Sequence, residues 1–199
     1  MCFLCYTIYN MIEEVFKIPI YKQKLKLDLK TIEDFCIDLN SKDKGKSISN
    51  AGGWQSNNLN LNKKIPELKE LLIDITKHGD VFVNNLKLKD KIKIYNFWIN
   101  INGYKDYNIT HKHPGALISG VYYVKTPKDC GNIIFEHPSE SFQSEWRMTP
   151  SEYNNYNSLT WWLPSEENNL YLFPSWLKHR VEPNLNKNEN RISISFNLI

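Results

Sequence analysis

Polar and apolar residues alternate along the first well-patterned segment of the chain. Between Val15 and Leu29, lysines and an aspartate interleave with leucines, which is the period of a strand with one solvated face. From Leu29 to Leu39 the apolar positions recur every three or four residues, as in an amphipathic helix. A second helical pattern follows Pro66, a residue well tolerated in the first turn of a helix, and ends before Gly79. A polar loop, residues 41–62, separates the two predicted helices.

The rest of the chain has the pattern of a β protein. The lysines between residues 87 and 93 alternate with apolar residues, so we interpret them as the solvated face of a strand rather than a nucleic-acid patch. Candidate strands separated by Pro, Gly and Asn turns follow, as in a sandwich or barrel. They are Lys91–Ile101, Leu117–Val124, Asn132–Glu136, Ser158–Leu163, Leu170–Phe173, His179–Glu182 and Arg191–Leu198. We predict one mainly β domain, residues 11–199, with two N-terminal helices packed outside an antiparallel double-sheet barrel.

The composition supports a folded domain and excludes several functions. Hydrophobic residues make up 41% of the 199, and a net charge of +3 is too small for a nucleic-acid footprint. No apolar run reaches the ~18 residues of a membrane span, and four cysteines are too few for a disulfide framework. Residues 1–10 hold a lone CxxC and no signal-peptide pattern; we interpret them as a disordered leader or as an extension before a true start at Met11. We expect a cytoplasmic protein with no membrane or nucleic-acid partner.

Histidines carry the strongest chemical signal. His111 and His113 form an HxH phrase after a predicted strand, and on an extended segment residues i and i+2 project from the same face. His179 begins a late strand, and early and late strands are neighbours in a double-sheet barrel. Three ligands on one face, with coordination positions left open, are typical of non-heme iron enzymes. Arg191, on the last predicted strand, suits bidentate pairing with a carboxylate.

Several phrases of the sequence also occur together in a characteristic order. They are Asn50-Ala-Gly-Gly-Trp54-Gln-Ser56, Trp98-Ile-Asn100, His111-Lys-His113-Pro114, Ser119-Gly-Val-Tyr-Tyr-Val124, Gly131-Asn-Ile-Ile-Phe135, Phe173-Pro-Ser-Trp176 and Arg191-Ile-Ser-Ile-Ser-Phe-Asn197. In these phrases, from about residue 11 to the end, the chain resembles the small 2-oxoglutarate/Fe(II) oxygenases, in a bacterial and phage branch distantly similar to prolyl hydroxylases. The resemblance implies a double-stranded β-helix (jelly-roll) fold. It also implies that Fe(II) and 2-oxoglutarate are the cofactors, and that oxidative decarboxylation of 2-oxoglutarate is coupled to hydroxylation of a substrate in a bacterium or phage-infected cell.

The resemblance assigns roles to individual residues. His111 would be the first iron ligand and His179 the distal one, while Arg191 would pair with the far carboxylate of 2-oxoglutarate. Ser193 and Tyr123 would be two further donors to the same carboxylate. Asn100 is a weaker candidate for contact with the cosubstrate or the substrate. By strand alternation, Tyr122 and Arg180 should point away from the site.

The sequence departs from the wider superfamily at His113, where a carboxylate is usual. In one interpretation, His113 completes a three-histidine site, so the protein ligands give the iron one negative charge fewer than a site with a carboxylate does. In another, His113 lies outside the ligand set and Glu136 or Asp106 is the third ligand. In a third, the site binds metal but is catalytically impaired.

Other residues are weaker candidates. Trp54, after two glycines, could cover a substrate or anchor its loop by packing, and His137 could line the mouth of the site. The polar and aromatic segment Ser139–Tyr156 is expected in the substrate rim. The sequence does not specify the oligomeric state or the substrate, which is a peptide or protein side chain or a small molecule.

Two other functions remain open. One is a cupin-type three-histidine metal enzyme that does not use 2-oxoglutarate. The HxH phrase favours it, whereas Arg191 and Ser193, following His179, speak against it. The other is a non-catalytic β-barrel binding protein.

Overall fold

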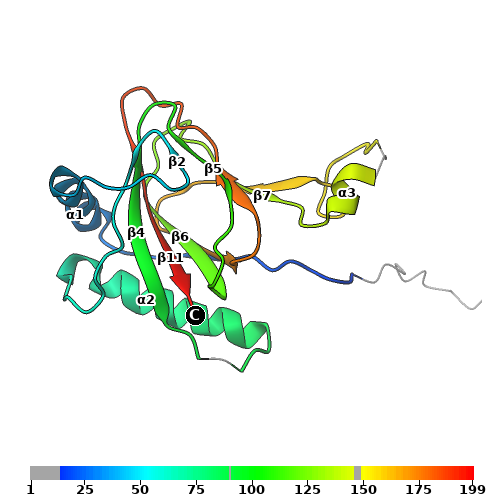
Figure 1. Ribbon diagram of the computed structural model, residues 1–199, viewed down its shortest axis with the longest axis horizontal. Coiled ribbons are helices and arrows are strands. Elements are labelled where there is room, and N and C mark those ends of the chain that lie inside the picture. The colour runs from blue at the N-terminus through cyan, green and yellow to red at the C-terminus, as the bar shows by residue number, and fades with distance from the viewer. Residues whose placement is uncertain (1–13, 90, 146–148) are drawn as a thin grey trace, which may run out of the picture.

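Two antiparallel sheets lie face to face, and two helices cover the outer side of one of them (Figure 1). The computed structural model describes residues 14–89, 91–145 and 149–199, so the expectations for residues 1–10 and Met11 lie outside the described residues. The larger sheet has the spatial order β1 (Tyr21–Lys24), β9 (Asn169–Pro174), β6 (Ile118–Lys125), β11 (Arg191–Leu198), β4 (Ile94–Asn102) and β3 (Trp54–Gln55). The smaller sheet has the order β2 (Asn50–Ala51), β5 (Tyr107–His111), β10 (His179–Val181), β7 (Ile133–Glu136) and β8 (Thr160–Leu163). The predicted mainly β, two-sheet architecture is confirmed.

The helices follow from the apolar spacing of the sequence. Asp28 caps the N-terminus of helix α1 (Leu29–Lys42), because its carboxylate accepts hydrogen bonds from the backbone N–H groups of Lys30 and Thr31. The helix buries Ile32 and Cys36. A single 3-10 turn, η1 (Pro66–Leu68), leads into α2 (Lys69–Asn85). A short third helix, α3 (Glu140–Glu145), lies beyond β7 (Figure 1). None of the described helices is long and apolar enough to cross a membrane.

The core has two layers on either side of the larger sheet. The outer layer packs α1, α2 and η1 against the sheet, and the smaller inner layer lies between the sheets, around Tyr123, Phe135 and Phe173. Strand β11 shows how the sequence divides its side chains. Its isoleucines, Phe196 and Leu198 belong to the outer layer, whereas Arg191, Ser193 and Ser195 line a cavity between the sheets. A buried strand that turns its polar residues inward marks that cavity as a functional site.

The structure corrects some expected boundaries. The exposed lysines after residue 86 do not form a strand face, because Lys87 has a positive φ of 58° after α2 and β4 begins only at Ile94. Helix α2 continues through Gly79 to Asn85, since the missing side chain lets Ile92 and Leu198 approach the helix closely. The alternating burial expected from Val15 to Leu29 holds from Tyr21 onwards, but only Tyr21–Lys24 pairs as a strand.

Strand β5 was not expected, and it carries part of the site. It pairs with both β2 and β10. Its sequence, YNITH, buries Asn108 and exposes Ile109, so no run of buried apolar residues identifies it. The strand is therefore specified by its partners rather than by its own hydrophobic pattern.

Candidate metal centre

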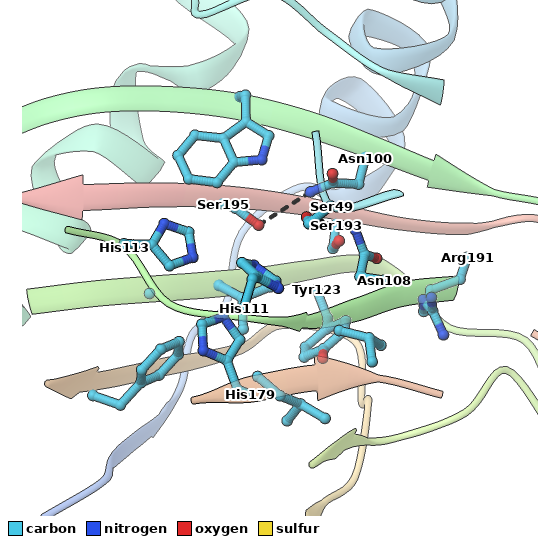
Figure 2. Close-up of a pocket in the computed structure, with 16 residues that line it drawn as sticks. Ser49, Asn100, Asn108, His111, His113, Tyr123, His179, Arg191, Ser193 and Ser195 are labelled. Atoms are coloured by element: carbon cyan, nitrogen blue, oxygen red, sulfur yellow. Dashed lines mark hydrogen bonds between the residues drawn. The ribbon is translucent and has the colours of Figure 1, made fainter. Parts of the chain in front are cut away.

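Paired strands bring three histidines together at one end of the cavity (Figure 2). His111, the last residue of β5, lies opposite His179, the first residue of β10. His113 follows two residues later, and its ring centroid is 5.0 Å from that of His111 and 5.2 Å from that of His179. Each ring offers one nitrogen as a potential ligand atom, and these three nitrogen atoms all lie within 4.8 Å of one another. These residues alone, among those described, form a cluster able to hold a metal ion.

Backbone hydrogen bonds fix the orientation of two of the rings. Nδ1 of His111 lies 2.7 Å from the carbonyl oxygen of Ile109, and Nδ1 of His179 lies 2.9 Å from that of Leu177. A proton on Nδ1 donates to this carbonyl and leaves the Nε2 lone pair free for a metal. His113 is held differently, because its ring stacks on Trp98 on one side and on His179 on the other.

The environment keeps the imidazoles neutral. Burial lowers the pKa of His113 to about 4 and that of His179 to about 3, and the neighbouring His111 contributes to the lowering of both. Burial also lowers the pKa of His111. Because a metal binds the unprotonated nitrogen, all three side chains are in their ligand form at neutral pH.

The larger sheet forms the opposite wall of the cavity. Ser193 on β11 is in register with Asn100 on β4 and with Tyr123 on β6, so these three polar side chains form one row across the sheet. Asn100 Nδ2 donates to Ser195 Oγ at 3.1 Å. The Asn100 side-chain carbonyl oxygen and the Tyr123 hydroxyl are buried without a hydrogen-bond partner among the described residues. Burial raises the pKa of Tyr123 to about 12, so the phenol remains a donor.

Arg191 closes the far end of the cavity (Figure 2). Only 1% of the residue is exposed, and its Nη1 donates to the backbone carbonyls of Cys130 and Glu182. Its Nη2 is buried without an acceptor. The charges of Asp106 and Glu182 act on Arg191, but these carboxylates accept hydrogen bonds from backbone N–H groups. Burial lowers the pKa of Arg191, but a guanidinium stays charged in proteins. A buried cation with an unused donor calls for an anionic ligand.

The carboxylates considered as third ligands are held elsewhere. Glu136 accepts a hydrogen bond from Thr110 and lies 3.6 Å from Arg180, and Asp106 accepts from the backbone N–H of Gly103. Neither lines the cavity. Of the two ligand sets considered, the geometry therefore favours the one in which His113 completes the site.

Other sequence candidates lie outside the cavity. Trp54 belongs to the outer core, and its indole N–H donates to the Asp43 carbonyl, so the structure does not bring it to the site. His137 stacks on Phe142 and lines a neighbouring groove. Tyr122 and Arg180 point away, as expected: Tyr122 lies in the outer core, and Arg180 contacts Glu136.

Four cavity residues with polar side-chain groups were given no role in the site from the sequence. Ser195 could have been found by extending the alternation of Arg191 and Ser193 by one step. Trp98, two residues before Asn100, follows from the same rule. Ser49 and Asn108, which line the cavity from the other wall, come from a loop and from the unexpected strand β5, and no local pattern marks them.

Comparisons with known proteins agree with this arrangement. A family model described as "Putative 2OG-Fe(II) oxygenase" matches residues 96–197, just over half of the chain. This match includes most of β4, the three histidines and Arg191. No curated protein matches the chain.

Solved structures of low sequence identity share the fold. A prolyl-4-hydroxylase from Pseudomonas putida is 12% identical, with a TM-score of 0.63, and the match covers 90% of this chain and 92% of that one. A viral collagen prolyl hydroxylase from Paramecium Bursaria Chlorella virus-1, in complex with 2-oxoglutarate, is 14% identical, with a TM-score of 0.54 and coverage of 90% and 94%. HygX from Streptomyces hygroscopicus, with nickel and 2-oxoglutarate bound, is 8% identical, with a TM-score of 0.57 and coverage of 91% and 82%. At these identities the likeness shows the fold alone.

Proposed function

The chain belongs to the 2OG-Fe(II) oxygenase family that this model describes, and from that premise we propose that it is a 2-oxoglutarate-dependent dioxygenase that hydroxylates its substrate. One observation carries the proposal. A single cavity holds three converging histidines at one end and a buried arginine with an unused Nη2 donor at the other. A metal ion at the histidines and a dicarboxylate reaching the arginine would together satisfy both ends of this cavity.

The histidines fit iron. Neutral imidazoles bind first-row divalent ions such as Fe(II), and three of them leave coordination positions for other ligands. In the proposed enzyme His111, His113 and His179 hold Fe(II). The chain positions them by strand pairing and by the two backbone carbonyls that accept from the Nδ1 atoms.

The far end of the cavity fits the distal carboxylate of 2-oxoglutarate. Arg191 would bind this carboxylate through its free Nη2, with Tyr123 and Ser193 as neutral donors. Asn100 would contact the cosubstrate or the substrate from the same wall. Bound together, Fe(II) and 2-oxoglutarate would supply the oxidising chemistry with O₂ as the oxidant: one oxygen atom would enter the succinate that forms with carbon dioxide, and the other would be inserted into a substrate C–H bond.

We propose a peptide or protein side chain as the substrate. Three features support this choice. The fold is similar to that of prolyl hydroxylases, and a groove of about 680 Å³ adjoins the metal end. Phe135 and Leu177 line the groove, and both also contact His179. The Phe135 ring lies against the His179 ring, and the Leu177 carbonyl oxygen faces His179 Nδ1. Tyr156 and Trp161 also line this groove, and Tyr156 is the last residue of the segment Ser139–Tyr156 that we expect in the substrate rim.

Anaerobic titration with Fe(II) tests the proposal. A visible charge-transfer band that appears only when both Fe(II) and 2-oxoglutarate are present would support it, as would oxygen uptake that depends on 2-oxoglutarate. Iron binding without the band would favour a metal enzyme that does not use 2-oxoglutarate. Absence of iron binding would leave a β-sheet binding protein without this chemistry.

A further inference from the structure

His113 is held in a different way from the other two histidines of the cluster. The Nδ1 atoms of His111 and His179 face backbone carbonyl oxygens at 2.7 and 2.9 Å. The ring nitrogens of His113 have no hydrogen-bond partner in the part of the chain that the structure describes. The His113 backbone N–H donates to the Ser175 carbonyl oxygen at 3.0 Å, but this hydrogen bond does not set the side-chain torsions. The orientation of the His113 ring therefore depends on packing.

Two stacked rings provide that packing. The centroids of the Trp98 and His113 rings are 5.6 Å apart, with 23° between the ring planes. His179 also stacks on His113, with 5.2 Å between the centroids and 7° between the planes. Both distances lie within the range of roughly 4.5–7 Å that is usual for aromatic pairs. Since the Leu177 carbonyl already orients His179, the freedom that remains to the His113 ring is limited by Trp98.

Strand β4 fixes the position of the Trp98 indole. Trp98 lies directly opposite Ser195 of β11, and both residues line the cavity. The neighbours of Trp98 in the strand, Phe97 and Ile99, pack in the outer core and so hold the backbone. Only 9% of Trp98 is exposed, which leaves its side chain little room to turn. The larger sheet thus provides a rigid aromatic wall for a candidate ligand that follows β5 of the smaller sheet.

We propose that Trp98 is a positioning residue for the third metal ligand, and that its indole is matched to a histidine at position 113. A carboxylate, the usual ligand at this position in the wider superfamily, has no ring that could stack on the indole. An imidazole has such a ring, and without a hydrogen bond it needs a flat neighbour to keep one nitrogen turned toward the metal. The inference rests on the proposed function and adds to it a residue that orients the metal centre.

Calorimetric titration of the full chain with Co²⁺, which is stable in air, tests this role without turnover. Trp98→Leu keeps an apolar side chain but removes the aromatic face. Its Co²⁺ dissociation constant should rise at least ~10-fold, the lower end of the range typical for residues that orient a metal ligand. Trp98→Phe retains a ring and should bind Co²⁺ nearly as the wild type does. Trp162→Leu is the matched control, because Trp162 is exposed and lies outside the cavity.

The visible absorption of bound Co²⁺ is the second readout, because it depends on the number and geometry of the ligands. The spectrum should change in Trp98→Leu and not in Trp98→Phe, whereas a mere loss of stability would leave the spectrum of the folded complex unaltered. A wild-type dissociation constant and spectrum in Trp98→Leu would overturn the proposal. If Trp98→Leu does not fold, Trp98→Met, with a longer and more adaptable side chain, gives the same comparison.

A double-mutant cycle tests whether Trp98 and His113 are matched. In the His113→Asp background there is no ring to stack, so adding Trp98→Leu should leave the Co²⁺ dissociation constant nearly unchanged. Equal fold-changes from Trp98→Leu in the two backgrounds would overturn the matching. If the His113→Asp chain does not fold, the comparison of Trp98→Leu with Trp98→Phe decides, since a stacking role requires the ring.

The outcomes also separate this inference from the proposed function. Weaker Co²⁺ binding in Trp98→Leu, together with no 2-oxoglutarate-dependent oxygen uptake by the wild type, would support the positioning role and contradict the enzyme activity. Oxygen uptake by the wild type, with unaltered Co²⁺ binding in Trp98→Leu, would support the enzyme activity and overturn the positioning role. Absence of Co²⁺ binding by the wild type would overturn the positioning role whatever the oxygen uptake.

Discussion

His179 lies directly opposite His111 across the paired strands β10 and β5, and the centroids of their rings are 4.4 Å apart. The pairing register, rather than a local loop, therefore sets the spacing of these two candidate ligands. Since Nδ1 of each histidine faces the carbonyl two residues before it, the two strands orient their rings in the same way. His113 joins them because it follows His111 by two residues, on the same face of the extended chain.

Removing His113 should abolish stoichiometric metal binding. His113→Ala deletes one of three neutral ligands. Its metal affinity should fall by more than the ~10–100-fold that is typical when a residue hydrogen-bonded to a metal ligand is removed. Calorimetry with Co²⁺ or anaerobic Fe(II) measures the change. Glu136→Gln and Asp106→Asn should bind metal as the wild type does, because both carboxylates lie outside the cavity. Unaltered binding in His113→Ala with loss in either of the other variants would identify a carboxylate as the third ligand.

Arg191→Gln should weaken 2-oxoglutarate binding while metal binding persists. The substitution removes a buried charged donor, and hydrogen bonds to charged groups are worth about 1.5–3 kcal/mol, or roughly 10–150-fold in affinity. The KM for 2-oxoglutarate and the dissociation constant of the metal complex give the two readouts. Arg180→Gln is the matched control, since Arg180 points away from the cavity and contacts Glu136. Similar losses in both variants would contradict the assignment of Arg191.

The metal-free protein should lose stability as the pH falls below about 6.5. Burial lowers the pKa of His113 to about 4 and that of His179 to about 3, whereas an unfolded histidine titrates near its ordinary value. Between these values the unfolded chain binds more protons than the folded one, so each histidine's contribution is present above pH ~6.5 and is lost on acidification. The slope is about 1.4 kcal/mol per pH unit for each such group.

Urea unfolding in the presence of a chelator, at several pH values from neutral to mildly acidic, measures this slope. His179→Gln should show a shallower slope than the wild type, because one titrating group is absent. An equal slope would mean that other groups carry the pH dependence.

Gly120→Ala should destabilise the fold. A Cβ at this position in β6 would lie 2.3 Å from Cζ of Phe196 and 2.8 Å from Cδ2 of Leu172, both in the outer core. Overpacking of this kind typically costs about 1–3 kcal/mol. Thermal unfolding measures the loss. Gly115→Ala is a useful comparison, since its Cβ would meet no atom within 4 Å and only its positive φ of 86° opposes the change. A loss in Gly120→Ala no greater than in Gly115→Ala would contradict the packing argument.

The site could be predicted from the sequence where alternation or fixed spacing applies. The inward row of Arg191 and Ser193 and the outward position of Tyr122 follow from the two-residue period of a strand. The HxH spacing likewise places His111 and His113 together. Strand β5 and its Asn108 could not be found in this way, because that strand buries polar residues and depends on neighbours distant in sequence. Gly79 suggested a false end for α2, since its role is set by Ile92 and Leu198 on other elements.

Trp161→Ala should impair substrate use without affecting the metal centre. Trp161 lines the groove next to the cavity and is paired with Phe135, whose ring contacts His179. Truncation of an anchoring aromatic residue costs at least about 1 kcal/mol of binding free energy, so the KM for a peptide substrate should rise about 5-fold or more. Trp162→Ala is the matched control, because Trp162 is also exposed but does not line the groove.

Oxygen incorporation into a mixture of proline-containing peptides, followed by mass spectrometry, measures substrate use, and Co²⁺ titration measures metal binding at the histidines. Equal effects of the two substitutions would exclude the groove as the substrate site, and unmodified peptides with the wild-type protein would contradict a peptide substrate of this kind.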